Sequence, residues 1–477
     1  MKTLLRFLLL FALWMNPLAG FGQDQTLTGE LPNWLLNRER VKAGVLSVPE
    51  NHDNPNSRKI RIAYAVLERR NKESNAYPII LFSGGPGDST LVQGMVDFLL
   101  EHPFLEDRDF ILFDQRGIGY SSGLPDMSMD TFLVMAADAD PSRERMLMDS
   151  VLSKYKKLSA EHNTDPQFYN TLQNARDVGM LLKHLGYAKY NLYGGSYGTR
   201  LGRVVQDYYP QFVHASILDS PSPLTGDFLI NRLESYNLAL ERIFEYCDAT
   251  PECRQNYPDL QGQYFKAIDR LGKDPIKTRV NDSIDFVINA QDGIYLLRRL
   301  LYMGNAREAA PEMIQAFQAG SGEIIQKVLG FEWQITGAVN MSMLLSVERF
   351  ENFNPANTEA VIEDHYRKYP LIPVTLGYFD AIYQAGHDWH PASMPVNERK
   401  FGTSDTPTLI FVNRYDPVTP PRNGRLFMKD LSRGHLLILD EGGHGQGNQQ
   451  CKEQVMMDFM TRPDTLPDVS CLNLYQE

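Results

Sequence analysis

A serine flanked by glycines is the first feature of this sequence that could do chemistry. Residues 194–198 read Gly-Gly-Ser-Tyr-Gly, which matches the pattern G-x-S-x-G with Ser196 at its centre. Because a serine hydroxyl is a weak nucleophile, it has to be presented on a strained turn between a strand and a helix. An apolar run ends just before this turn and a helical pattern follows it. We therefore interpret Ser196 as a nucleophile rather than as part of an ordinary glycine turn.

An aspartate and a histidine further along the chain could complete a catalytic triad with Ser196. Asp416 and His444 each follow a short apolar run, and the order Ser, Asp, His is the order found in α/β-hydrolases. His444 would act first as general base and then as general acid, while Asp416 would orient its imidazole and stabilise the imidazolium. Asp219, which also follows an apolar run, is the alternative acid.

Two backbone N–H groups are predicted to hold an oxyanion. The turn that presents Ser196 also aims the N–H of Tyr197 at the charge that develops on the substrate. The second donor is the N–H of Gly85 in the loop Ser83-Gly84-Gly85-Pro86-Gly87, where adjacent glycines let the backbone approach a ligand closely. A simple glycine-rich turn is the alternative interpretation of this loop.

Eight short apolar runs predict the strands that position these residues. The first two predict an antiparallel ribbon, and the others are solid rather than alternating, which is typical of a parallel sheet covered on both faces. Helical patterns dominate between the sixth and the seventh run. The predicted fold is therefore α/β, an α/β-hydrolase fold whose mostly parallel central sheet carries a mainly helical cap inserted between the sixth and seventh core strands. The runs are Gly44 to Val48, Ile60 to Val66, Ile79 to Phe82, Phe110 to Phe113, Tyr190 to Tyr193, Ala215 to Leu218, Thr408 to Val412 and His435 to Leu439.

The start of the chain is typical of a secretory signal peptide. Lys2 and Arg6 precede a short apolar segment, and small residues follow it near a possible cleavage site. We expect export to the periplasm or to the medium, with no stable membrane association after cleavage. The predicted organisation is a signal peptide at 1–22, a first core part at 23–220, a cap at 221–404, and a second core part with a C-terminal tail at 405–477.

Composition and cysteine count narrow the classes of function. The 477-residue chain has a formal net charge of −12 and no concentrated basic run, so we expect no nucleic-acid partner. An even number of cysteines in an exported chain argues for two disulfides, one within each neighbouring pair, although four cysteines allow three pairings. The cysteine spacing and the absence of an HExxH motif predict no metal and no cofactor. Oligomeric state is left open. The cysteine pairs are Cys247 with Cys253 and Cys451 with Cys471.

Several motifs together resemble the proline iminopeptidase and tripeptidyl aminopeptidase group of α/β-hydrolases, peptidase family S33. The combination of a DQRG loop with a GGSYG turn is specific to a degree that neither motif reaches alone. Segments 44–49 and 451–471 resemble the entry strand and the closing cysteine pair of the tripeptidyl branch. The matching core segments are 114–121 (DQRGIGYS), 195–198 (GSYG), 405–407 (DTP) and 416–420 (DPVTP).

This resemblance implies a serine aminopeptidase that releases residues or short peptides, of tripeptidyl or prolyl type, from peptides with a free N-terminus through an acyl-enzyme. It also implies a cap carboxylate that pairs with the substrate ammonium, because a buried cation needs a partner. The segment that reads VxCAE in the group corresponds here to residues 347–351, so Glu351 is the candidate. Glu348 and Glu332 are its competitors.

The sequence departs from the group at two positions. Ser83 stands where the group has the histidine of HGGPG, which leaves the support of the oxyanion loop open. Arg349 stands where the group has a cysteine, and residues 386–389, where the partner of that cysteine is expected, contain no cysteine either. We therefore expect the cap disulfide between these two positions to be absent here. Two other functions fit the same residues, namely a carboxylesterase or lipase and a non-catalytic binding module. A dehalogenase or epoxide hydrolase would have aspartate at position 196.

Overall fold

The computed structural model describes residues 30–476, apart from residues 55, 122, 139, 225–226 and 355. The signal peptide predicted at 1–22 therefore lies outside the described residues. Among the helices of the described part, none has both the length and the apolar character that a membrane span requires.

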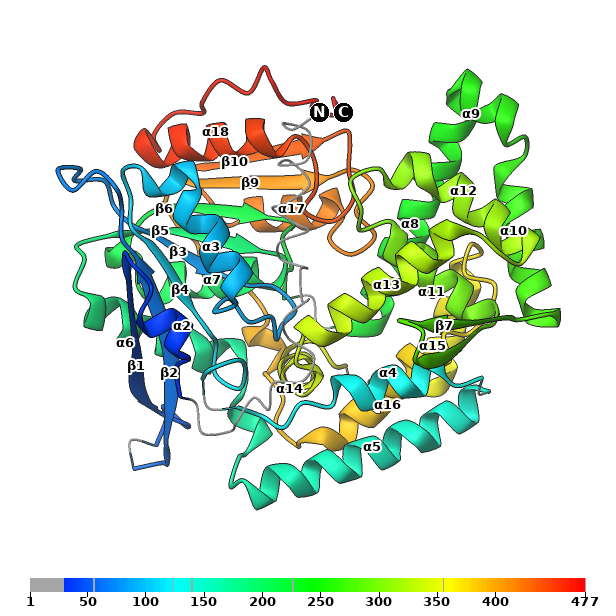
Figure 1. Cartoon of the computed structure of the whole chain (residues 1–477), viewed down its shortest axis with the longest axis horizontal. Helices are drawn as coiled ribbons and strands as arrows, with labels where there is room; N and C mark the ends of the chain where they lie inside the picture. The colour runs from blue at the N-terminus through cyan, green and yellow to red at the C-terminus, as the bar shows by residue number, and fades with distance from the viewer. Residues whose placement is uncertain are drawn as a thin grey trace.

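An eight-stranded sheet forms one half of the molecule (Figure 1) and has the order β1-β2-β4-β3-β5-β6-β9-β10. The ribbon of β1 and β2 is antiparallel, β2 also pairs antiparallel with β4, and all other pairs are parallel. This confirms the predicted mostly parallel sheet. The strands are β1 (Val41–Pro49), β2 (Lys59–Leu67), β3 (Ile79–Phe82), β4 (Phe110–Phe113), β5 (Tyr190–Gly195), β6 (Val213–Asp219), β9 (Thr408–Asn413) and β10 (Gly434–Leu439).

Helices cover both faces of this sheet, which explains why the central strands are solidly apolar. Every residue of β3, β4 and β9 is buried. Alternate strand residues face opposite layers: Leu81 packs with α3 and α18, whereas Ile80 and Phe82 pack with α6 and α7. The helices around the sheet are α2 (Asn33–Leu36), α3 (Gln93–Glu101), α6 (Thr171–Leu185), α7 (Tyr197–Tyr208), α17 (Pro421–Met428) and α18 (Gln449–Thr461).

A helical cap is inserted between β6 and β9, the sixth and seventh strands of the core, as predicted. It also contains a small antiparallel hairpin of β7 (Ile276–Val280) and β8 (Ile284–Ile288). The cap helices are α8 (Phe228–Ala249), α9 (Pro251–Asn256), α10 (Leu260–Lys273), α11 (Ala290–Leu300), α12 (Ala306–Ala319), α13 (Glu323–Ala338), α14 (Met341–Glu351), α15 (Glu359–Lys368) and α16 (Gly377–Trp389).

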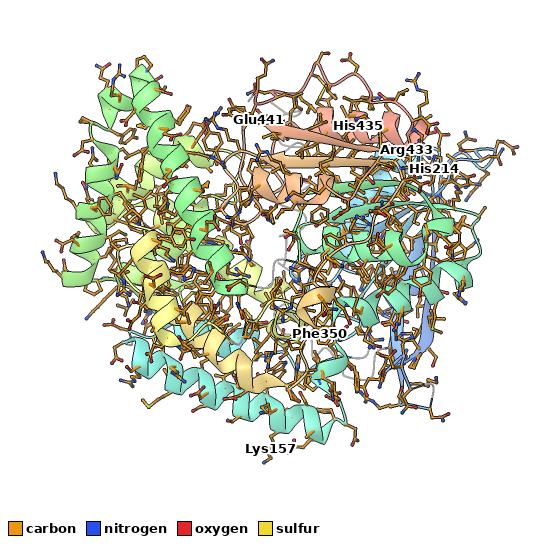
Figure 2. All side chains as sticks on the ribbon, turned by 180° about the vertical axis from the view of Figure 1, so that it is seen from behind. Lys157, His214, Phe350, Arg433, His435 and Glu441 are labelled. Carbon is orange, nitrogen blue, oxygen red and sulfur yellow. A yellow bond between two sulfur atoms is a disulfide. The ribbon has the colours of Figure 1, made fainter. Side chains whose placement is uncertain are left out.

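Two helices that precede β5 in the chain, α4 (Ser128–Ala136) and α5 (Pro141–Glu161), pack with the cap and not with the sheet. Helix α5 runs beside α16 (Figure 1) and buries one stripe that includes Met148 and Leu152. Its outer side carries charges such as Lys157, which points away from the molecule (Figure 2). Both helices fall within residues 23–220, which were predicted as the first part of the core. An amphipathic pattern gives the buried face of a helix, but not the layer that buries it.

Two disulfides join neighbouring cysteines in the pairing expected from the sequence. Cys247 and Cys253 link α8 to α9, and their Cα atoms are 5.0 Å apart. Cys451 and Cys471 tie the C-terminal tail to α18, with a Cα separation of 6.0 Å.

Candidate active site

Ser196 lies on a sharp turn between β5 and α7. Its backbone angles, φ 52° and ψ −122°, are strained for a residue with a side chain. Gly194 and Gly198 make the turn possible: a Cβ on Gly198 would lie 2.0 Å from the carbonyl oxygen of Phe82, and one on Gly194 would lie 2.5 Å from that of Gly198. The chain therefore has the strand-to-helix turn that the sequence predicts around Ser196.

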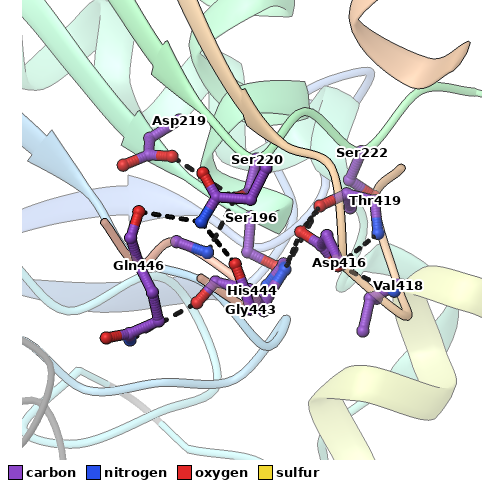
Figure 3. A network of polar contacts seen from close by, with 12 residues as sticks. Ser196, Asp219, Ser220, Ser222, Asp416, Val418, Thr419, Gly443, His444 and Gln446 are labelled. Carbon is purple, nitrogen blue, oxygen red and sulfur yellow. Dashed lines mark hydrogen bonds and ion pairs between the residues drawn. The ribbon is translucent and has the colours of Figure 1, made fainter. Parts of the chain in front are cut away.

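His444 and Asp416 are joined by a short hydrogen bond. His444 Nδ1 and Asp416 Oδ2 are 2.7 Å apart, and both side chains are buried. The carboxylate of Asp416 also accepts hydrogen bonds from the N–H groups of Val418 and Thr419, at 2.7 and 2.8 Å, and from Thr419 Oγ1 at 2.6 Å. These donors come from the loop after β9 and fix the carboxylate toward the imidazole (Figure 3).

Asp416 and His444 shift each other's pKa in opposite directions. Burial by itself would raise the pKa of Asp416, but the charge and hydrogen bond of His444 and the donors of Thr419 lower it below its usual range. Burial would likewise lower the pKa of His444, but Asp416 outweighs it and raises the pKa above 6.5. This pair favours an imidazolium balanced by a carboxylate, which is what a general base needs after it has taken a proton.

One cavity of about 230 Å³ is lined by Ser196, His444 and Gly85, the predicted nucleophile, base and oxyanion donor. Tyr197 is the first residue of α7, where backbone N–H groups have no partner within the helix. The side chain of Tyr197 turns away and its hydroxyl pairs with Thr171 Oγ1 at 2.9 Å. The structure therefore brings the predicted nucleophile, the predicted base and Gly85 to one cavity.

Ser83 supports the oxyanion loop in place of the histidine of the related group. Its hydroxyl donates to the carbonyl oxygen of Asp88 at 2.7 Å, which ties the two ends of the loop together. Gln115 Nε2 in turn donates to Ser83 Oγ at 3.2 Å. Gln115 was not among the predicted site residues, although it belongs to the DQRG motif on which the resemblance rests.

Asp219, the alternative acid, has a different partner. Lys452 Nζ lies 2.5 Å from Asp219 Oδ2, and both side chains are buried. The next residue, Ser220, accepts a hydrogen bond from the N–H of Gly445 at 2.9 Å and so helps to hold the loop of His444 (Figure 3). Asp219 thus neutralises a lysine beside the site, while Asp416 holds the imidazole.

The assignment of Glu351 as the cap carboxylate of the site is wrong for this structure. Glu351 is completely buried and does not line the cavity. Its carboxylate accepts hydrogen bonds from Arg200 Nη1 at 2.8 Å and from the N–H of Thr171 at 2.7 Å. The physical reason is that Arg200 on α7 is itself buried against α14 and needs a counter-charge. Of the competitors, Glu348 also lies by Arg200, whereas Glu332 lines the cavity.

The cap holds both loops that surround Ser196. The N–H of Asn340, between α13 and α14, donates to the carbonyl oxygen of Gly87 at 3.1 Å. The loop of His444 approaches the end of α11 so closely that a Cβ on Gly443 would lie 2.0 Å from the carbonyl oxygen of Leu301. The cap therefore contributes to the geometry of the oxyanion loop and of the histidine loop.

The cap side of the cavity also carries three arginines that were not predicted as site residues. Arg232, Arg298 and Arg299 line the cavity together with several tyrosines and with Glu332, a predicted competitor of Glu351. Arginines in amphipathic helices usually lie on the solvated face, and no pattern in the sequence marked these as buried. Among the described residues, no three His, Cys, Asp or Glu side chains gather as a metal site would need.

Comparisons with known proteins agree with this geometry. Residues 77–264 match a family model described as the alpha/beta hydrolase fold, and residues 381–471 match one described as TAP-like protein. The chain has the α/β-hydrolase fold. The first match contains the Ser196 turn, and the second contains the loops of Asp416 and His444.

Curated relatives are peptidases. Tripeptidyl aminopeptidase of Streptomyces coelicolor is 27% identical over 475 residues, which cover 92% of this chain and 84% of that protein. Serine protease Hip1 of Mycobacterium tuberculosis is 26% identical over 194 residues, 37% of this chain and 35% of that protein. These similarities confirm the predicted resemblance to the tripeptidyl aminopeptidase group and the prediction of a serine hydrolase.

A solved structure of proline iminopeptidase from Mycobacterium smegmatis is a more distant match. It has 15% sequence identity and a TM-score of 0.38, and the match covers 88% of this chain and 98% of that one. A likeness of this size says nothing about the site.

Proposed function

We propose that this chain is an exported serine aminopeptidase that releases residues or short peptides from free N-termini through an acyl-enzyme. One observation carries the proposal: Ser196, on its strained turn, lines the same cavity as His444, whose imidazole is held by Asp416. The family matches and the peptidase relatives support the same function. Export rests on the sequence of residues 1–22.

The proposed reaction has two halves. Ser196 Oγ attacks the peptide carbonyl while His444 Nε2 takes its proton, and Asp416 stabilises the imidazolium. The N–H groups of Gly85 and Tyr197 hold the oxyanion. His444 then gives the proton to the leaving amine. Water enters, loses a proton to His444 and attacks the acyl-enzyme. As the tetrahedral intermediate collapses, His444 returns the proton to Ser196 Oγ and the acid is released.

An aminopeptidase also has to recognise the substrate ammonium, and we assign this role to Asp88. Its side chain lines the cavity, and its buried Oδ1 makes no hydrogen bond within the described structure. Burial raises the pKa of Asp88 to about 7, although the charge of His444 opposes the shift. A substrate ammonium beside it would supply a partner and favour the charged carboxylate. The other carboxylates that line the cavity have partners: Glu332 is ion-paired with Arg299, Asp219 with Lys452, and Glu453 lies by His102.

Comparing free and blocked substrates tests the proposal. The mature enzyme is given mono-, di- and tripeptidyl p-nitroanilides with free and with acetylated N-termini, and a p-nitrophenyl ester. We expect kcat/KM to be about 100-fold higher for the free amine, the scale of a lost partner in a buried charge pair. Equal rates on free and blocked substrates, with faster cleavage of the ester, would instead indicate an esterase.

Two variants separate binding of the amine from the chemistry. Ser196→Ala should abolish both turnover and labelling by a fluorophosphonate, whereas a folded wild-type protein that is not labelled would indicate a binding module. Asp88→Asn should keep the labelling and lose the preference for a free amine. Glu332→Gln serves as the comparison, because it neutralises the cap carboxylate that lines the same cavity. If Glu332→Gln and not Asp88→Asn removes the preference, the assignment of the ammonium partner is wrong.

A further inference from the structure

The cap lines the cavity with more positive than negative charge. Among the described cap residues, two guanidinium groups of α11, those of Arg298 and Arg299, line the cavity together with one carboxylate, that of Glu332 on α13, and Arg232 on α8 lines it as well. Glu332 is ion-paired with Arg299 and accepts a hydrogen bond from Tyr295 at 2.7 Å. Glu332 therefore balances Arg299 and not Arg298.

Arg298 is the member of this group whose hydrogen-bonding capacity is least used. Its side chain is 2% exposed, and its Nε and Nη2 atoms make no hydrogen bond to any residue that the structure describes. Its guanidinium lies over the rings of Tyr302, at 5.5 Å, and Phe379, at 5.7 Å. Aromatic rings interact with the face of a guanidinium, whereas its N–H donors lie in the plane and suit a carboxylate fork. The rings thus position Arg298 without occupying its donors.

The effect of these charges is visible on their neighbours. Burial and the nearby charge of Arg298 together lower the pKa of Arg232 to about 10, although the charge of Glu348 opposes the shift. Burial would raise the pKa of Tyr302, but Arg298 and Arg299 bring it down to about 8. The shift of Tyr302 has the sign expected for a group in positively charged surroundings.

The arginines lie close to the reaction centre. Arg299 also packs over Tyr302, at 4.6 Å, and the Tyr302 ring lies 5.2 Å from the ring of His444. One aromatic ring therefore contacts the guanidinium groups and the imidazole. Since a residue of extended peptide spans about 3.3–3.6 Å, a substrate group that reaches Arg298 lies within a few residues of the scissile bond.

We propose that Arg298, with Arg299 beside it, forms a subsite for a carboxylate of the peptide substrate. The inference rests on the proposed peptidase function and names the substrate class: peptides with a carboxylate near the scissile bond. That group is either an aspartate or glutamate side chain or the C-terminal carboxylate of a short peptide, and a guanidinium fork binds both in the same way.

Peptide pairs that differ by one carboxylate test this subsite and distinguish the two sources. In the first arm, tripeptidyl p-nitroanilides carry glutamate or glutamine at each position in turn. In the second arm, unblocked peptides of equal length end in a free carboxylate or an amide. We expect one position in one arm to gain about tenfold or more in kcat/KM from the carboxylate, the size of a charge-assisted hydrogen bond.

Arg298→Met should abolish this gain, so that the acidic and neutral members of a pair are cleaved at similar rates, while Arg298→Lys should keep part of it. Arg279→Gln is the matched control, since Arg279 lies in the exposed β7–β8 hairpin and pairs with Asp285. The inference is overturned if no carboxylate in either arm raises kcat/KM, or if Arg298→Met loses activity on acidic and neutral substrates alike.

Failure of the proposed function would look different. Cleavage of neutral peptides without any carboxylate preference overturns the subsite alone. If Ser196 is labelled by a fluorophosphonate but no peptide is cleaved, the peptidase proposal fails. Calorimetric binding of the same peptide pairs to Ser196→Ala then decides the subsite, and equal affinity for both members of every pair overturns it.

Discussion

At the scale of single residues, the proposed reaction depends on the charge of one imidazole. Because Asp416 raises the pKa of His444 above 6.5, the neutral base is lost as the pH falls through that raised value. We therefore expect kcat/KM to fall on the acid side with a midpoint above 6.5. Asp416→Asn removes the cause of the shift, so the midpoint should move to lower pH and kcat should drop about 10⁴-fold. A pH profile of both enzymes measures the two effects.

Asp219→Asn is the control for that profile, since Asp219 pairs with Lys452 and not with the imidazole. Its midpoint should move down less than that of Asp416→Asn, because the charge of Asp219 also raises the pKa of His444 but is a smaller cause than Asp416. The acid would be misassigned if Asp219→Asn moved the midpoint further down than Asp416→Asn.

The sequence could predict residues whose position follows from the chain itself. Ser196, Asp416 and His444 each follow a parallel strand, β5, β9 and β10, at the same edge of the sheet, so their order along the chain implies that they meet. Glu351 and Arg298 depend instead on which helix packs against which. Glu351 faces a buried arginine of the core, and Arg298 faces the cavity, and neither fact follows from helical periodicity.

At the scale of elements, the nucleophile turn depends on the contact between β3 and α7. A Cβ on Gly198 would lie 2.0 Å from the backbone oxygen of Phe82, which cannot move without displacing the strand. Gly198→Ala should therefore destabilise the fold by about 1–3 kcal/mol, as overpacking does, and should reduce fluorophosphonate labelling of the folded fraction. Urea unfolding and labelling of the same samples measure both.

Gly330→Ala is the matched control for this substitution. Gly330 lies inside α13, and an added Cβ there would meet nothing within 4 Å. Alanine should leave stability unchanged or raise it by about 0.5–1 kcal/mol, because glycine weakens a helix interior. Equal effects at the two positions would mean that the turn tolerates a side chain.

The predicted strands coincide with the observed ones to within a few residues because each solid apolar run is bounded by residues that cannot continue it. The run Ile79 to Phe82 is flanked by Pro78 and a glycine cluster, and it is the observed β3. The hairpin of β7 and β8 has alternating exposed and buried residues within a helical region, which is a weaker signal. Strands buried on both faces are thus easier to predict than half-exposed ones.

At the scale of the whole molecule, the cavity exists because the cap is fastened onto the core. The bond from Asn340 to Gly87 and the close approach of Gly443 to Leu301 join the cap to the two loops beside Ser196. The buried pair of Arg200 and Glu351 joins α7, which follows Ser196, to α14 of the cap. Glu351 therefore belongs to the attachment of the cap and not to recognition of the substrate amine.

This distinction gives a prediction with two readouts. Glu351→Gln leaves the buried guanidinium of Arg200 without its full counter-charge, which should lower the free energy of unfolding by about 3–5 kcal/mol. On the folded enzyme, the ratio of KM values for free and blocked N-termini should not change, because Glu351 does not line the cavity. The triple variant Arg200→Met/Glu348→Gln/Glu351→Leu, which also removes the charge of Glu348 beside Arg200, should recover most of the stability. If Glu351→Gln instead folds as stably as the wild type and raises KM only for free-amine substrates, Glu351 reaches the substrate and the cap must rearrange to bring it there.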